Sequence, residues 1–400
     1  MSGVVTQPGA PAGPLAGVRV FDLTVWMVGP WASMQLGALG ADVIHIEKPD
    51  TPPSELGAGV PPTIAGTSAG YIAWNMNKRG LGLDLKREED QQIAVEVLRS
   101  CDVFLVNMRP GVADRLGLGY EAVADVRPDI VYCSVTGWGG SGPLVKKPGS
   151  DILMQARSGF ASLNGPEGER GQFYRHYAQL DPIAGEYAVQ GILMALYHRR
   201  RTGRGQFVEV SMLESALTLQ TLSFADFLAT GKEPRPLGSA SRMTAPDEAL
   251  LCQDNCYVGV AVRNDDEWRR FCEVVELPQA VRDDPRYTTN DARVTNRRDL
   301  TKELEPLFQA MPSEYWMQRL TKARVPCGYS LRFDVLRNHR QVLENAYLCD
   351  VETPWGDVTT GGSPWDFAEQ STRRWASPLP GQHTEEILRE LGIVRPGEAR

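Results

Sequence analysis

Residues 18–47, VRVFDLTVWMVGPWASMQLGALGADVIHIE, decide the fold. The first six of them, residues 18–23, are apolar enough for a buried strand, and residues 41–47 have the same character. Between the two runs, residues 30–39 follow a helical pattern. That pattern begins with a proline, which suits a first turn, and it ends before Gly40, which suits a helix stop. This order predicts a β-α-β unit with parallel strands.

The same alternation continues further along the chain. Residues 87–100 carry apolar side chains at helical spacing, while residues 102–106 and 129–135 are apolar runs of strand length. Residues 49–70 are rich in Pro, Gly, Ser and Thr, which predicts a loop. Strands that alternate with helices are typical of a mostly parallel sheet covered on both faces. The predicted fold class is α/β, with a Rossmann-like large domain.

A long helix is predicted to open at Asp181-Pro182 and to run to about Arg200. Because it is apolar on nearly every face, it should lie deep in the protein. Residues 206–211 then alternate as a strand, and residues 212–229 have a helical pattern.

The pattern changes after this helix and indicates a second domain. We predict a large domain over residues 15–229, a linker over 230–247 and a smaller α+β domain over 248–325. Residues 326–400 are predicted to return to the large domain as a strand- and loop-rich segment that closes with a helix over residues 385–391.

The net charge of the chain limits the classes of molecule that it can bind. The formal net charge of -8 disfavours broad binding to nucleic acids or anionic membranes, because both are negatively charged. There is also no run of 18 apolar residues of the kind that spans a membrane. A local basic pocket for a small phosphorylated molecule remains compatible with this charge.

Cysteine usage and the start of the sequence favour the cytoplasm. The chain has seven Cys, an odd and sparse number, and neither Cys nor His stands at zinc-site spacing. We therefore expect reduced thiols and no metal site. Residues 1–14 lack the basic and apolar regions of a signal peptide and are predicted to form a loose arm.

The glycine-rich stretch Gly137-Trp138-Gly139-Gly140-Ser141-Gly142 matches the dinucleotide pattern G-x-G-x-x-G. Pro143 and Pro148 follow it, so no helix is expected to open there toward a pyrophosphate. The context argues against NAD and against a nicotinamide-dependent dehydrogenase. We interpret the stretch as a loop near an active site.

Asp181 has two interpretations that the residues alone do not separate. An Asp before a Pro at a helix start is a good N-cap, worth about 1 kcal/mol. A helix N-terminus also favours an ionised carboxylate, which could attack an acyl thioester.

Ordered segments along the chain carry a family resemblance. They are Leu15 to Thr24, Gly29-Pro30, Leu39 to Ile44, Glu47-Lys48-Pro49, Asn77-Lys78-Arg79, Leu83 to Lys86, Asp102-Val103, Val106 to Gly111, Arg115 to Leu118, Asp181 to Gly185, Gly191 to Leu196 and Thr202 to Gln206. Over roughly residues 15–395 the sequence resembles the class III coenzyme A transferases, the CaiB/BaiF family.

The resemblance implies a function and a site. Asp181 stands where these enzymes carry the aspartate that becomes acylated, and Asp151 where many carry an acidic residue beside it. The implied substrate is coenzyme A as a thioester, and the implied assembly is an interlocked homodimer. Segments that usually contact coenzyme A hold Lys48, Asn77, Lys78, Arg79, Asn107, Met108 and Arg115.

Two departures bear on the substrate. Met27 stands where some formate- and oxalate-handling members carry Gln, and Ser150 where they carry Tyr, which argues against a formyl-CoA/oxalate enzyme. The surrounding residues are bulky and mostly apolar, which suggests a larger or less polar acyl group. They are Trp26, Met27, Val28, Trp31, Trp74 and Trp138.

Two alternatives remain open beside the transferase. A 2-methylacyl-CoA racemase of the same family needs a pair of groups for proton transfer, and it typically has His at the position of Ser150. A non-catalytic acyl-CoA-binding protein would need no nucleophile, and the presence of Asp181 argues against it.

Overall fold

The structure is a computed structural model that describes residues 13–370, 372 and 375–395. The chain forms two compact units. The large unit holds the described residues up to Phe160, Tyr174–Thr230 and those from Arg340 onward, and the small unit holds Ala161–Phe173 and Gly231–His339. The boundaries proposed from the sequence stay predictions. The arm predicted for residues 1–14 lies almost wholly outside the described residues.

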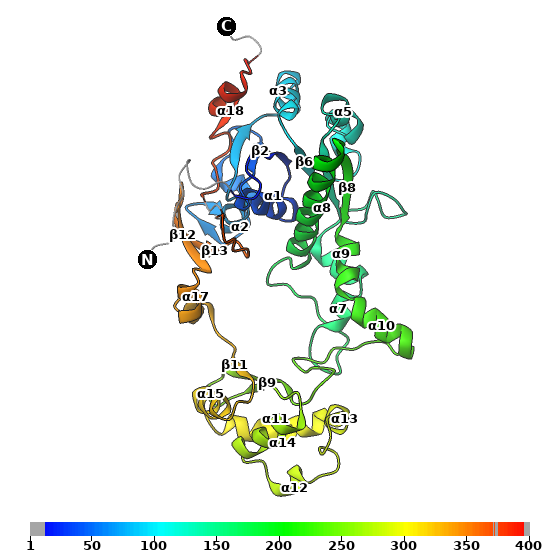
Figure 1. Ribbon diagram of the computed structural model, residues 1–400, viewed down its shortest axis with the longest axis vertical. Helices are drawn as coiled ribbons and strands as arrows, with labels where there is room; N and C mark the ends of the chain where they lie inside the picture. The colour runs from blue at the N-terminus through cyan, green and yellow to red at the C-terminus, as the bar shows by residue number, and fades with distance from the viewer. Residues whose placement is uncertain (1–12, 371, 373–374, 396–400) are drawn as a thin grey trace. The chain divides into compact units, whose positions relative to one another are not determined.

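A parallel sheet organises the large unit (Figure 1). Six strands lie in the order β5-β2-β1-β6-β7-β8, and every neighbouring pair is parallel. This confirms the predicted α/β class with a parallel sheet. The strands are β1 (Arg19–Leu23), β2 (Asp42–Glu47), β5 (Arg79–Gly82), β6 (Val103–Val106), β7 (Val131–Thr136) and β8 (Gln206–Ser211).

The strand order creates a switch point between β1 and β6. From β1 the chain moves outward to β2 and β5, then returns to place β6 on the other side of β1. In sheets of this kind, ligands bind in the crevice at the carboxyl ends of the strands where the order reverses. Residues 24–27 and Asn107, which follow β1 and β6, are therefore expected beside a site.

Helices cover both faces of the sheet. On one face α1 (Val28–Ala38) and α8 (Leu180–Thr202) pack against β1, β6 and β7. On the other face lie α3 (Glu88–Arg99), α5 (Tyr120–Val126) and α18 (Thr384–Leu391). The α1–α8 contact is close at Gly185, where an added Cβ would lie 2.9 Å from the carbonyl oxygen of Val28.

Two helix predictions need correction. The apolar pattern of α8 predicted burial all round, but Met194 is 66% and Tyr197 65% exposed, because only the Ala184–Ala188–Ile192 side faces the sheet. The helix predicted over residues 212–229 is two helices, α9 (Met212–Leu219) and α10 (Thr221–Thr230). They part at Gln220, whose buried amide donates to the carbonyls of Ser158 and Ala216.

Short elements complete the large unit. The loop predicted over residues 49–70 contains a 3₁₀ segment and two short strands. The elements are η1 (Pro53–Gly59), β3 (Thr63–Ile64), β4 (Thr67–Ser68), α2 (Ala69–Trp74), α4 (Val112–Arg115), α6 (Asp151–Arg157), α17 (Arg340–Glu344), β12 (Leu348–Thr353) and β13 (Gly356–Gly361); α7 (Phe160–Leu163) begins at the unit boundary.

The small unit has its own core around a three-stranded antiparallel sheet, in the order β11-β10-β9. Its strands are β9 (Asp247–Leu251), β10 (Tyr257–Ala261) and β11 (Cys327–Tyr329). Its helices are α11 (Asp265–Val274), α12 (Gln279–Arg282), α13 (Asn290–Thr295), α14 (Arg297–Gln309), α15 (Ser313–Lys322) and α16 (Phe333–Leu336).

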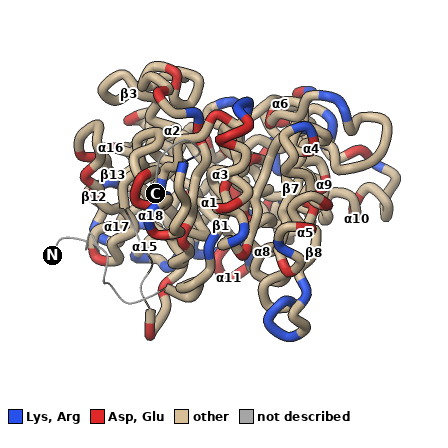
Figure 2. Tube along the Cα trace, turned by 90° about the horizontal axis from the view of Figure 1, so that it is seen from above, with Lys and Arg blue, Asp and Glu red and all other residues tan. Residues whose placement is uncertain are grey.

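Charges of both signs are distributed along the trace, with a basic turn at the end of α8 (Figure 2). None of the helices in the described residues is long and apolar enough to cross a membrane. Within that same part of the chain, no group of three or more His, Cys, Asp and Glu residues could hold a metal ion.

Gly185→Ala is expected to lower the free energy of unfolding by about 1–3 kcal/mol. Alanine alone would favour the helix by about 1 kcal/mol, but its Cβ would crowd Val28 and Trp31, each at 2.9 Å. Thermal unfolding followed by circular dichroism measures the change. Gly191→Ala on the same helix is the control, because its Cβ would meet a single side-chain atom, Cγ1 of Val208, and no backbone atom of a neighbouring helix. Equal effects of the two variants would contradict this packing constraint.

Candidate active site

The loop after β1 is fixed at the switch point by Asn107. The Asn107 Oδ1 accepts from the backbone N–H of Val25 at 2.9 Å, and its Nδ2 donates to the Val25 carbonyl at 2.7 Å. The next residue, Trp26, has a φ of 66°, which a bulky side chain seldom adopts. Asn107 thus holds a strained turn that leads directly into α1.

Asp181 lies where α1 and α8 begin side by side. Its carboxylate accepts a hydrogen bond from the backbone N–H of Val28, the first residue of α1. The N-cap of α8 is Gln179, so the interpretation of Asp181 as the cap is wrong; Asp181 is the second residue of the helix. Its side chain is therefore directed by the neighbouring helix as well as by its own.

Burial and a neighbouring charge raise the pKa of Asp181 to about 7. Burial is the larger cause, and the carboxylate of Asp151 is the second. The sequence argument expected the helix start to favour the ionised form. The N–H groups do act in that direction, but burial and Asp151 outweigh them.

Asp151 is the first residue of α6 and is 5% exposed. Its Oδ1 accepts from the backbone N–H of Leu180 at 2.9 Å, and its Oδ2 accepts from Nε2 of Gln155 at 2.6 Å. The bond to Leu180 ties α6 to the start of α8. Two carboxylates 30 positions apart in sequence are thereby brought together.

A cavity of about 820 Å³ opens at the start of α1, next to Val28, the residue whose N–H interacts with Asp181. Its wall includes Met27 and Pro30 at the start of α1, together with Ala178, three residues before Asp181. Asp181 itself is not among the lining residues. The wall also carries the bulky side chains of Trp26, Tyr71 and Trp74, so much of the lining is aromatic. The cavity is large enough for a drug-sized ligand.

A network of buried charged side chains lies at the cavity wall. His45 Nδ1 lies 2.9 Å from Oδ2 of Asp22, and Lys78 Nζ lies 3.1 Å from the same oxygen. On the other side, His45 Nε2 lies 3.4 Å from Glu47, which accepts from the Tyr71 hydroxyl at 2.7 Å. Three members of this network line the cavity, so the network forms part of the cavity wall. They are His45, Glu47 and Tyr71.

The network sets the protonation of its members. Burial alone would lower the pKa of His45, but Asp22 and Glu47 raise it to about 9. Burial raises the pKa of Asp22, but Lys78 and His45 reverse that effect and hold it well below its usual value. His45 is therefore a buried cation at neutral pH.

Comparisons with known proteins identify the family. CoA-transferase family III matches residues 15–384. The chain belongs to CoA-transferase family III. It is 32% identical to the human succinyl-CoA:glutarate CoA-transferase, over 94% of this chain and 86% of the human protein. It is 35% identical to the acetyl-CoA:oxalate CoA-transferase of Acetobacter aceti, over 81% of this chain and 82% of that protein.

A solved structure agrees with these relatives. The crystal structure of a CaiB/BaiF family protein from Brucella suis has a TM-score of 0.86 and 29% identity, and the match covers 95% of this chain and all of that one. The resemblance recognised in the sequence is confirmed. The protein is an enzyme of the CoA-transferase type.

The residues predicted to contact coenzyme A fall into two groups in this family III enzyme. Lys48 and Met108 line the cavity. Asn107 is hydrogen-bonded to Val25 at the edge of the cavity, and Arg115 is exposed in α4. Asn77, in contrast, accepts from the backbone N–H of Trp375 at 2.9 Å. Lys78 is buried in the charge network described above.

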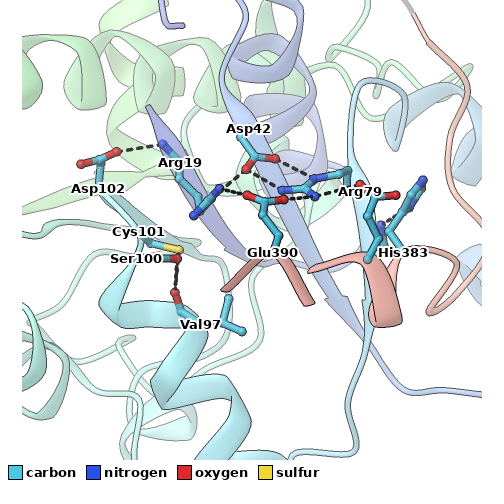
Figure 3. A network of polar contacts seen from close by, with 11 residues as sticks. Arg19, Asp42, Arg79, Val97, Ser100, Cys101, Asp102, His383 and Glu390 are labelled. Carbon is cyan, nitrogen blue, oxygen red and sulfur yellow. Dashed lines mark hydrogen bonds and ion pairs between the residues drawn. The ribbon is translucent and has the colours of Figure 1, made fainter. Parts of the chain in front are cut away.

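Arg79 also has internal partners. Its guanidinium pairs with Asp42 at 2.6 Å and with Glu386 and Glu390 of α18, and Arg19 joins the same cluster (Figure 3). These pairs tie the C-terminal helix to β5 and β2. The structure brings Asp181 and Asp151 together and places Lys48 and Met108 at the cavity, whereas Asn77, Lys78 and Arg79 make contacts inside the transferase.

Sequence reasoning overlooked parts of this site. It did not place His45 beside Asp22, and it did not single out Glu47 and Tyr71 as a pair. One available signal was Asp22, a charged residue in the middle of an apolar strand, which requires a buried partner. The loop Gly137–Gly142 follows β7 with turns as far as Lys147, and α6 starts only at Asp151.

The raised pKa of His45 makes a prediction about stability. Because the folded-state pKa of about 9 exceeds the ordinary histidine pKa of 6.5, the stabilisation is complete below about pH 6.5 and is lost as pH rises through about 9. Unfolding free energies measured from pH 6 to 10 should fall in the wild type and fall less in His45→Gln. His198→Gln, at an exposed position, should keep the wild-type slope. Parallel curves for the wild type and His45→Gln would refute the assignment.

Proposed function

We propose that this enzyme transfers CoA from an acyl-CoA donor to a carboxylic acid through covalent intermediates on Asp181. One observation carries the proposal: two carboxylates, Asp181 and Asp151, meet at the starts of α8 and α6 beside a cavity of about 820 Å³. A carboxyl whose pKa is about 7 is ionised in part at neutral pH and is a stronger base than an ordinary Asp.

The first half of the reaction acylates the enzyme. The Asp181 carboxylate attacks the thioester carbonyl carbon, the carbon–sulfur bond breaks, and a mixed anhydride and CoA thiolate result. The thiolate then attacks the aspartyl carbonyl. The donor acid leaves as a carboxylate, and an aspartyl-CoA thioester remains on the enzyme.

The second half reverses these steps with the acceptor. The acceptor carboxylate attacks the aspartyl-CoA thioester and forms a new anhydride, releasing the thiolate. Attack of that thiolate on the acyl carbonyl makes the new acyl-CoA and frees Asp181. The Val28 N–H already donates to this carboxylate, and backbone N–H groups of the Gly137–Gly142 loop are proposed as further donors to the oxyanions.

Coenzyme A is proposed to occupy the cavity. Its phosphates would be met by Lys48, and its pantetheine arm would pass Met108 and the turn held by Asn107. Arg115 is proposed as an outer contact for the nucleotide. The resemblance also assigns Asn77, Lys78 and Arg79 to coenzyme A. We propose that these residues act indirectly, by holding the cavity wall in position.

Dicarboxylic acids are the proposed substrate class. The acids glutarate, oxalate and mesaconate in the names of the relatives are all diacids, while the thioesters named beside them are succinyl-CoA, acetyl-CoA and formyl-CoA. Met27 and Ser150 disfavour oxalate, and the apolar wall suits a longer chain. We therefore favour diacids of about four or five carbons. The racemase alternative lacks its base at Ser150, and the relatives named here are transferases.

Asp181→Ala is expected to abolish transferase turnover and covalent capture, because no carboxylate remains to attack the thioester. The wild type incubated with succinyl-CoA should give a peptide containing Asp181 that carries the acyl or CoA adduct in mass spectrometry, and hydroxylamine should convert it to the hydroxamate. In Asp151→Asn the adduct should still form, with its pH dependence moved to lower pH because the pKa of Asp181 falls. An adduct on another residue, or near-normal turnover in Asp181→Ala, would end the proposal.

We further propose that the enzyme is cytoplasmic, as its free cysteines suit, and that it is a homodimer of the interlocked kind. Exposed apolar side chains of the large unit support the dimer: α10 has no buried side chain among its described residues, and Leu228 is 79% exposed. Met194 and Tyr197 of α8 and Phe224 of α10 are exposed as well. An apolar surface of this kind is typical of subunit interfaces.

A dimer predicts that sedimentation velocity will give the mass of two chains for the wild type. Phe224→Asp combined with Leu228→Asp should shift much of the protein to one chain, because two charges would be buried without partners. Val394→Asp, at an exposed position elsewhere, should leave the mass unchanged. A wild type that sediments as one chain would rule out the assembly.

A further inference from the structure

The segment Tyr174–Tyr177, which leads into α8, is fixed to the carboxylate pair by Gln155. The Gln155 Nε2 donates to the carbonyl of Tyr174 at 2.9 Å, and its Oε1 accepts from the Tyr174 N–H at 2.9 Å. The same Nε2 also donates to Asp151. One buried amide therefore sets the position of this segment and of Asp151 together.

Arg175 stands beside that pair. Its Nη1 lies 3.9 Å from Oδ2 of Asp151, and 58% of its side chain is exposed. A direct charge-assisted hydrogen bond would be about 2.7–2.9 Å. Asp151 already accepts from Leu180 and Gln155, so its buried oxygens are satisfied by neutral donors. The guanidinium is thus held near the site while it stays open to a ligand.

The neighbouring residues face the cavity. His176, Tyr177 and Ala178 line it, and three residues after Ala178 comes Asp181. In the described part of the chain, Arg175 is the cation within ion-pair distance of Asp151. Lys48 and Lys86 also line the cavity, but they follow β2 and β5 rather than the segment that leads into α8.

We propose that Arg175 binds the second carboxylate of a dicarboxylic substrate while the first is at Asp181. The inference rests on the proposed function and names the residue that selects its substrate class. The two neighbouring carboxylates repel an incoming anion, and a second negative charge on the substrate adds to that repulsion. A guanidinium offers a fork of donors that matches a carboxylate and offsets this charge.

The length of the diacid restricts where such a cation can lie. With carbon–carbon bonds of about 1.5 Å, the two carboxyl carbons of a four- or five-carbon diacid lie roughly 4–5 Å apart. The distal carboxylate therefore stays in the immediate neighbourhood of the nucleophile. Arg175, in ion-pair range of the carboxylate that raises the pKa of Asp181, is in that neighbourhood.

Succinyl-CoA and butyryl-CoA test the assignment, because their acyl chains have equal length and only the first carries a distal carboxylate. The wild type should prefer succinyl-CoA in kcat/KM for CoA transfer. Arg175→Gln should lower kcat/KM for succinyl-CoA about 10- to 100-fold, as loss of a charge-assisted hydrogen bond does, and should leave the value for butyryl-CoA within about threefold. Arg175→Lys should recover part of the loss, since it keeps the charge without the fork.

Arg170→Gln is the matched control, because it removes an exposed arginine five residues earlier and should leave both substrates unaffected. Equal losses on both thioesters in Arg175→Gln, or an unchanged preference for succinyl-CoA, would overturn the role of Arg175. A wild type that uses butyryl-CoA as well as succinyl-CoA would also overturn it, together with the preference for diacids, while CoA transfer through Asp181 would stand. A wild type that transfers CoA from neither donor would overturn both.

Discussion

The close approach of α1 and α8 is the constraint on which the site depends. Gly185 lets the backbones of the two helices meet, and an added Cβ there would lie 2.9 Å from the Val28 carbonyl. At the mouth of this contact the N–H of Val28 reaches the carboxylate of Asp181. Because α1 starts directly after the turn of β1, the same contact aligns Asp181 with the switch point of the sheet.

Burial gives the pair of carboxylates its chemical character. A carboxylate at an open helix start would be an ordinary anion and a poor nucleophile. Here burial and the charge of Asp151 raise the pKa of Asp181, while Asp151 is held by the Leu180 N–H and by Gln155. Hydrogen bonds from Leu180 of α8 and Gln155 of α6 offset the repulsion between the two like charges. The raised pKa of Asp181 therefore depends on the positions of α6 and α8.

The sequence predicted the framework well and the side-chain partners poorly. The sequence pattern located β1, α1 and β2 to within two residues, since apolar runs bounded by Pro30 and Gly40 leave strong local signals. It missed β5, a four-residue strand whose sequence Arg79-Gly80-Leu81-Gly82 has little strand character. With β5 unplaced, Arg79 could not be seen beside Asp42, because that pairing depends on strand order and not on spacing along the chain.

Lys78 and His45 show the same limit more sharply. The sequence around each of them gives no sign of its partner, yet both contact the same buried carboxylate, that of Asp22. In this network Asp22 and Glu47 hold His45 as a cation, and Lys78 Nζ lies 3.1 Å from Asp22, so these four groups are engaged with one another. Lys48, in contrast, lines the cavity, and 58% of the Arg175 side chain is exposed. In the proposed function these two cations meet the phosphates and the distal carboxylate of the thioester, because the fold leaves them accessible to an anionic ligand.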